Sequence, residues 1–142
     1  MKSTFKFTAI LLAGLFLFSC TKDKNQSTES LLTSITWVFD RLETNSQDEL
    51  VIGLLALAEA LMTDATYTFR LDGTYTMSAL GETDDGTWEL SSDEKTVTFD
   101  KGTADEYQQT IVKLNGNELV LRSEEDPADE EPYTVTFYWL RD

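Results

Sequence analysis

Short runs of alternating apolar and polar residues dominate the second half of the chain. Apolar side chains alternate with polar ones at residues 66–71, and residues 74–78, 87–90 and 96–99 repeat the pattern. Successive side chains of a strand point to opposite faces, so each run predicts a strand with an apolar face and a threonine-rich face. The pattern predicts an antiparallel meander.

Turn residues separate these runs and indicate how the strands connect. Asp72-Gly73 and Asn115-Gly116 are typical of two-residue hairpins, because glycine tolerates a positive φ. A longer acidic loop is expected at residues 80–85, a turn at residues 91–94, and an acid-rich loop at residues 123–132. Links of hairpin length favour strands that pair in chain order.

Further strands are expected at residues 36–42, 107–114, 118–122 and 133–141. The run at 107–114 alternates imperfectly, which indicates either a bulge or a strand covered on both faces. About eight antiparallel strands suggest closure into an up-and-down barrel, because closure removes the exposed sheet edges. The predicted fold class is mainly β, a barrel of about eight strands with one helix after the first strand.

That helix is expected just after residue 46. Ser46 and Glu49 have the spacing of a capping box, in which Ser46 caps the helix. Two adjacent apolar stripes follow at helical spacing: Leu50, Leu54, Leu57 and Leu61, then Val51, Leu55, Ala58 and Met62. So broad an apolar face predicts that one end or one side of the sheet covers the helix.

The N-terminus has the features of an export signal at residues 1–19. Lys2 and Lys6 precede an apolar run at residues 7–18, which is shorter than the ~20 residues that a bilayer requires. The residues Leu17-Phe18-Ser19-Cys20 resemble the bacterial lipobox, which implies lipidation of Cys20. The alternative is an ordinary signal peptide followed by a chance cysteine.

The resemblance to a lipobox also implies a location. Thr21 rather than Asp follows Cys20, the chain's one cysteine, and this implies a lipid anchor in the outer membrane, on its periplasmic or cell-surface face. Residues 20–30 are polar after the cysteine and predict a flexible tether. The folded domain is expected at residues 31–142.

The charge balance limits the classes of partner that are expected for this chain. The chain has 26 acids and 11 bases, and loss of residues 1–19 would leave 26 against 9, a net charge of −17. Nucleic-acid binding requires clustered Lys and Arg, so it is not expected. The acids suit either a solvated surface or recognition of a basic partner.

At the level of the whole domain the chain resembles the lipocalin-like lipoproteins of Gram-negative bacteria, within the calycin group. The resemblance is carried by the lipobox, by Trp37 early in the first strand, by Gly86-Thr87-Trp88-Glu89-Leu90 and by residues 95–99 and 114–121. It implies that a small apolar molecule binds inside the barrel.

One position departs from the lipocalin pattern. Ile35 stands where lipocalins carry glycine, two residues before the tryptophan of the first strand, so the floor of the barrel is expected to differ. The resemblance also implies a basic residue packed over Trp37, and Arg141 and Arg122 are equal candidates for it.

Little in the chain suggests catalysis or a cofactor. There is no histidine, the one thiol is assigned to lipidation, and no glycine-rich phosphate loop is present. We therefore expect no enzyme, no cofactor and no metal site. The acidic residues at 82–85 and 124–131 leave weak calcium binding as an alternative to solvated loops.

The apolar face of the barrel is the candidate site. The residues expected to line it and to contact a ligand are Trp37, Phe39, Phe69, Tyr75, Met77, Trp88, Phe99, Phe137 and Trp139. An eight-stranded barrel can be filled by side chains or can hold one small ligand. The two functional hypotheses are thus an envelope protein that binds a small apolar molecule, and a filled-barrel module that binds another protein.

Overall fold

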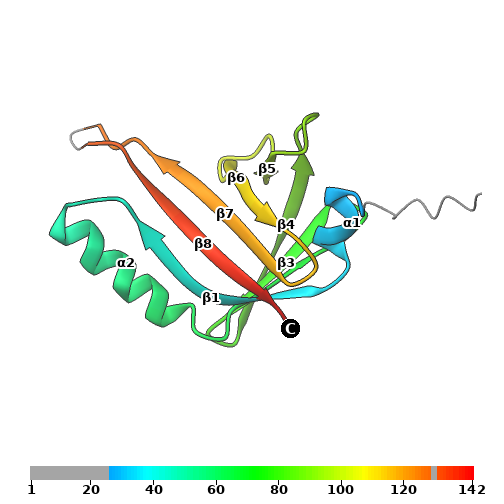
Figure 1. The fold of residues 1–142 in the computed structure, drawn as a ribbon, viewed down its shortest axis with the longest axis horizontal. Helices are drawn as coiled ribbons and strands as arrows, with labels where there is room; N and C mark the ends of the chain where they lie inside the picture. The colour runs from blue at the N-terminus through cyan, green and yellow to red at the C-terminus, as the bar shows by residue number, and fades with distance from the viewer. Residues whose placement is uncertain (1–25, 129–130) are drawn as a thin grey trace, which may run out of the picture.

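The computed structural model describes residues 26–128 and 131–142. Figure 1 shows one barrel with a short helix at one end and a longer helix beside it. The elements in chain order are α1 (Thr28–Thr33), β1 (Thr36–Thr44), α2 (Glu49–Leu61), β2 (Thr66–Phe69), β3 (Thr74–Ala79), β4 (Glu82–Leu90), β5 (Thr96–Phe99), β6 (Tyr107–Leu114), β7 (Glu118–Glu125) and β8 (Tyr133–Arg141).

The eight strands form a closed antiparallel barrel in chain order, as the sequence predicted. Closure is made by β1 and β8, which pair from Trp37 with Arg141 to Thr44 with Val135. Among the described residues, the eight strand pairs of the closed barrel, α1, α2 and the buried core all belong to the segment 26–142.

One end of the barrel is closed by α1, and we call it the closed end. Leu32 on α1 is fully buried, and the Trp37 indole Nε1 donates to its carbonyl oxygen at 3.0 Å. The flexible tether was predicted to extend to residue 30, but α1 begins at Thr28 with Ser27 as its N-cap. The tether prediction is therefore wrong for residues 28–30, which are helical because Leu32 becomes buried only if this turn of helix packs on the barrel.

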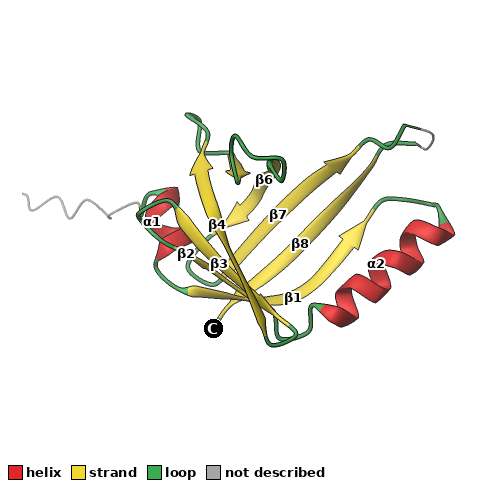
Figure 2. Ribbon diagram, turned by 180° about the vertical axis from the view of Figure 1, so that it is seen from behind, coloured by secondary structure: helices red, strands yellow, loops and turns green. Residues whose placement is uncertain are grey.

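The opposite end, which we call the open end, carries the β3–β4 turn, the β5–β6 loop and the β7–β8 loop. Figure 2 shows α2 running beside β1 at this side of the molecule rather than through the barrel. The loop predicted at residues 80–85 is shorter than expected, since Leu80 and Gly81 make a tight turn with positive φ and β4 begins at Glu82.

Helix α2 differs from its prediction in the residue that caps its N-terminus and in how much of its apolar surface is covered. The N-cap is Asp48, whose carboxylate accepts from the amides of Leu50 and Val51, and Ser46 instead accepts from the amide of Asp48. Val51 is the buried residue of the helix, whereas the stripe of Leu50, Leu54, Leu57 and Leu61 is 46–69% exposed. The predicted cover by one side of the sheet is therefore present where α2 packs beside β1, but it does not extend to the leucine stripe.

The irregular alternation of β6 is a bulge. The pairing of β6 with β7 shifts between Ile111 and Lys113, so that Ile111 and Leu114 both pack against the core while Val112 is exposed. A second shift lies in β1 between Phe39 and Arg41. Both shifts let apolar side chains stay inside although the sequence spacing changes by one residue.

Candidate functional site

All nine predicted binding residues belong to the core of the barrel, but they differ in exposure. Trp37, Phe39, Phe69, Tyr75, Trp88, Phe99 and Trp139 are buried, at 0–8% exposure. Met77 and Phe137 are partly buried and pack against the others. The two partly exposed side chains are therefore the ones that a molecule entering the barrel would meet first.

The buried set fills the interior next to the closed end. Phe69 lies edge-on to Trp88 at 5.4 Å between ring centroids, and Tyr67 stacks on Phe69 at 4.8 Å. Trp139 lies edge-on to Tyr67 at 5.2 Å and to Phe39 at 5.5 Å. These contacts are the offset and edge-to-face arrangements that aromatic pairs prefer, so this half of the barrel is a packed core.

The interior becomes accessible toward the open end. Leu42, Met77 and Phe137 pack on the core but keep part of their surface exposed, and Tyr107 is 40% exposed although its ring stacks on Phe99. A cavity of about 380 Å³ lies at the rim between residues 45–48 and residues 131–133. The cavity at the rim is lined mainly by polar side chains, whereas the partly exposed side chains of the interior are apolar, so the open end combines a polar rim with an apolar interior.

Tyrosine hydroxyls are the main polar groups on the inner face. The Tyr67 and Tyr107 hydroxyls are 3.1 Å apart, and the Tyr75 hydroxyl donates to Asp100 Oδ2 at 2.7 Å. Burial raises the pKa of Tyr67, Tyr75 and Tyr107 above its usual range, and the hydrogen bond to Asp100 raises that of Tyr75 further. All three phenols therefore remain neutral at physiological pH.

Two further polar side chains face the interior, Gln109 toward the open end and Trp139 toward the closed end. Gln109 is 9% exposed and donates to the Ser123 hydroxyl at 3.0 Å. Trp139 is 3% exposed, and its indole Nε1 has no hydrogen-bond partner among the described residues. Gln109 is not among the nine residues predicted from the sequence, although it lies two residues after Tyr107 and therefore on the same face of the strand.

Carboxylates frame the open end. Asp84 pairs with Met77 and Glu125 pairs with Tyr133, and cross-strand partners share a face, so both carboxylates lie on the inner side. Asp105 and Glu106 follow in the β5–β6 loop. The electrostatic potential at the entrance is consequently negative, which disfavours the entry of anions.

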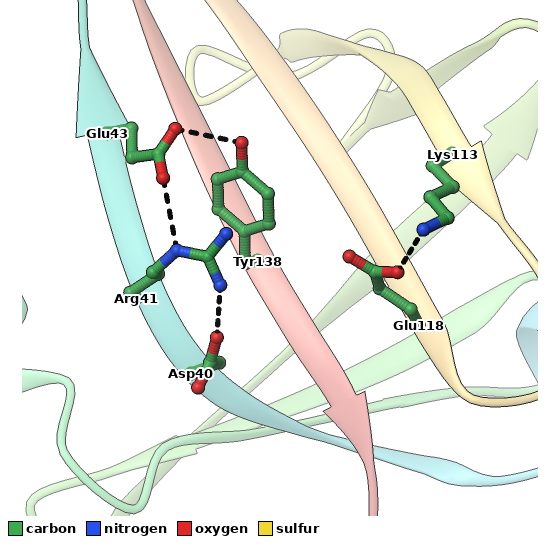
Figure 3. Close-up of polar contacts among 6 residues, drawn as sticks. All are labelled: Asp40, Arg41, Glu43, Lys113, Glu118 and Tyr138. Atoms are coloured by element: carbon green, nitrogen blue, oxygen red, sulfur yellow. Dashed lines mark hydrogen bonds and ion pairs between the residues drawn. The ribbon is translucent and has the colours of Figure 1, made fainter.

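The outer face of β1 and β8 carries a separate polar network, shown in Figure 3. The Arg41 guanidinium lies 3.7 Å from the centre of the Tyr138 ring and is paired with Asp40 and Glu43, at 2.6 and 3.1 Å. The Tyr138 hydroxyl donates to Glu43 at 2.9 Å. Hydrogen bonds from Tyr138 and Arg41 hold the pKa of Glu43 below its usual value, and the network fastens the β1 bulge to β8.

The structure also separates the two candidates for a basic residue near Trp37. Arg141 is the strand partner of Trp37 and donates to the Gly116 carbonyl at 3.3 Å. Arg122 lies farther along the barrel, where it is paired with Glu124. Arg141 is thus the basic residue adjacent to Trp37, and Ile35 is partly buried and packs against the core.

Two further kinds of feature, metal-binding clusters and membrane-spanning helices, concern residues 26–128 and 131–142. Over these ranges no cluster of three or more Asp, Glu, Cys or His residues is placed to hold a metal ion. In the same part of the chain, no helix combines the length and the apolar character that crossing a bilayer requires. Cys20 and the predicted export signal lie outside the described residues.

A closed up-and-down barrel of eight strands, with a helix over one end and an accessible interior at the other, defines a lipocalin-type protein. The family model for the lipocalin-like domain matches residues 36–121, and the chain belongs to this family. The search of curated proteins gave no match. Among solved structures the chain is similar to a DUF4847 family protein from Bacteroides vulgatus, at 16% identity and a TM-score of 0.46, over 78% of this chain and 96% of that one.

Proposed function

We propose that this protein binds a small apolar molecule at the open end of its barrel, as a lipid-anchored protein of the bacterial envelope. The observation that carries the proposal is the contrast between the two ends. Leu32 and α1 seal the closed end, whereas Leu42, Met77 and Phe137 at the open end face inward with part of their surface exposed. Binding would bury these side chains, and burial of apolar surface favours association by about 25 cal/mol per Å².

Native mass spectrometry tests ligand binding. Residues 26–142 would be incubated with an envelope extract of the host and measured without detergent. A reproducible adduct that denaturation releases supports the proposal, and Phe137→Glu should lose it because a carboxylate would enter the apolar wall. Leu71→Glu is the matched control, since Leu71 is 72% exposed elsewhere. An unliganded mass, with no uptake of an apolar dye, would count against binding.

The anchor belongs to the same proposal and rests on the lipobox-like residues ending in Cys20. Residues 21–27 join Cys20 to α1, and seven residues extend over at most ~25 Å. An anchor there would hold the closed end nearer the membrane and leave the open end facing away. We expect Cys20→Ala to move the protein from the membrane fraction to the soluble fraction in its host. Membrane retention of this variant would refute the anchor and leave the binding proposal unaffected.

A second candidate function is an interaction module with a filled barrel. Two observations favour it: the packed aromatic interior at the closed end, and the exposed leucine stripe of α2. Cross-linking in the host with Leu54→Asp and Leu57→Asp together, compared with the control Leu71→Asp, would test this function. Loss of a specific cross-linked partner in the double variant alone would favour the interaction module.

Both candidate functions are binding functions, and we infer that the protein is not an enzyme. The tyrosines inside the barrel are held neutral by burial, so they lack the reactivity of a general base. Because one hydroxyl of the Tyr67–Tyr107 pair donates to the other, this pair keeps one O–H group that can donate to a bound molecule.

A further inference from the structure

The three tryptophans of the barrel differ in how their indole N–H groups are satisfied. Trp37 donates to the Leu32 carbonyl at 3.0 Å, and Trp88 donates to the carbonyls of Arg70 and Thr74 at 3.1 and 3.0 Å. Trp139 is as buried as the other two, yet its N–H meets no acceptor among the described residues. A buried donor without an acceptor is costly, so a specific reason is expected for it.

The position of Trp139 relates this donor to the open end. Trp139 pairs with Leu119 on β7 and with Phe39 on β1. Phe137 precedes it by two residues on the same face of β8, one step nearer the open end, and is partly exposed. A molecule that enters from the open end would therefore have to pass Phe137 to reach this part of β8.

The surrounding groups indicate which acceptor would suit this donor. The phenols of Tyr67 and Tyr107 remain neutral and share one hydrogen bond, so the pair keeps one O–H group that, like the indole, can donate a hydrogen bond. The carboxylates of Asp84 and Glu125 lie on the inner side of the entrance and disfavour an anion. An uncharged oxygen, as in an ester, a ketone or an alcohol, satisfies both conditions.

We propose that the open end selects an uncharged, oxygen-bearing apolar molecule whose oxygen accepts a hydrogen bond from Trp139 Nε1, and that free fatty-acid anions are rejected. This inference rests on the proposed ligand-binding function and specifies its chemistry. Trp139 is the residue that recognises the oxygen, and Glu125 contributes to the rejection of anions.

The direct test is the ¹H–¹⁵N spectrum of ¹⁵N-labelled residues 26–142, in which each tryptophan gives one indole signal. Three probes with similar chains would be titrated: methyl octanoate, octanoate and nonane. We expect methyl octanoate to shift the Trp139 indole proton resonance downfield. Nonane has no hydrogen-bond acceptor and should not cause this downfield shift. Trp139→Phe identifies the signal by its loss.

Affinities provide the second measurement. We expect methyl octanoate to bind ~5–10-fold more tightly than nonane, the effect of about one hydrogen bond, and this ratio should fall to ~1 in Trp139→Phe. Octanoate should bind more weakly than its ester, and Glu125→Gln should narrow that difference. Glu124→Gln on the outer face of the same strand is the matched control.

The outcomes separate this inference from the proposed function. If methyl octanoate and nonane bind equally and the Trp139 signal does not shift, the inference is overturned while apolar binding stands. If octanoate binds as tightly as its ester, the charge selection is overturned. If none of the probes binds, the proposed function fails and this inference fails with it. If Trp139→Phe does not fold, resonance assignment of the unmodified protein identifies the Trp139 signal, and the titration then decides the point.

Discussion

At the scale of single residues, Gly86 shows how tightly the inner face is built. A side-chain Cβ at this position would overlap Asp100 Oδ1 and would lie 2.6 Å from the Tyr75 ring. Asp100 adopts a positive φ of 50°, and its carboxylate accepts from both the Tyr75 hydroxyl and the Thr87 amide. The absence of a side chain at Gly86 lets Tyr75 lie against the backbone of β4 while its hydroxyl reaches Asp100.

Gly86→Ala should therefore destabilise the protein by ~1–3 kcal/mol, because the ring and the carboxylate have to move. Gly53→Ala is the matched control: no atom lies within 4 Å of its Cβ, it is helical, and alanine should raise stability by ~0.5–1 kcal/mol. Urea unfolding of both variants measures the two changes. Equal stability of Gly86→Ala and the unmodified protein would contradict this account of Tyr75.

The buried tyrosines predict a loss of stability at high pH. The folded state raises the pKa of Tyr67 and Tyr107, mainly by burial, so folding holds protons that the unfolded chain releases near pH 10. Stability is then fully present below about pH 10 and declines as the pH rises above it. Urea unfolding at about pH 8 and about pH 10.5 should show the decline, and Tyr67→Phe should reduce it. A pH-independent free energy of unfolding over this range would refute the prediction.

At the scale of elements, the two helices contribute unequally to stability. Helix α1 has six residues, yet it places the fully buried Leu32 against Trp37 at the closed end. Helix α2 has thirteen residues, and its leucine stripe remains exposed. The burial of its side chains against the barrel, rather than its length or apolar content, decides how much a helix contributes to the free energy of unfolding.

Two equivalent substitutions test this difference. Leu32→Ala should cost ~2–5 kcal/mol, as expected for truncation of a buried leucine. Leu54→Ala removes the same atoms from a side chain that is 57% exposed, and should change stability by no more than ~0.5 kcal/mol. Thermal unfolding of residues 26–142 provides both values. A large loss in Leu54→Ala would mean that the stripe is covered in solution.

At the scale of the whole molecule, the distribution of negative charge over the barrel affects both stability and the entry of ligands. The chain has a formal net charge of −15, with carboxylates concentrated in the loops of the open end. Like charges repel in the compact state, and the repulsion is greatest where the loops converge. The same charge that favours solubility therefore lowers stability and disfavours anions at the entrance.

Added salt should raise the melting temperature. Increasing the ionic strength from about 0.01 M to about 0.15 M shortens the screening length from ~30 Å to ~8 Å, which weakens repulsion across the open end more than the short ion pairs. Differential scanning calorimetry at the two ionic strengths measures the change. A melting temperature that falls with salt would show that the surface ion pairs outweigh the repulsion.

Local pattern alone determined most of the fold of this protein. Alternation in β2, β3 and β5 and the Asp72-Gly73 and Asn115-Gly116 turns predicted antiparallel strands in chain order, because these features depend on residues that are adjacent in sequence or in a hairpin. The inward position of the nine candidate binding residues followed from the same periodicity.

Tertiary structure decided the features that depend on which surfaces meet. Periodicity gave α2 two equivalent apolar stripes, and packing on β1 left the leucine stripe exposed. Three tryptophans looked alike in sequence, and only the surrounding carbonyls distinguish Trp139 from Trp37 and Trp88. The sequence by itself thus determined the strands, their order and their inner faces. The folded barrel decided which inner side chains are packed and which remain accessible, because burial and hydrogen-bond satisfaction depend on neighbours that are distant in the chain.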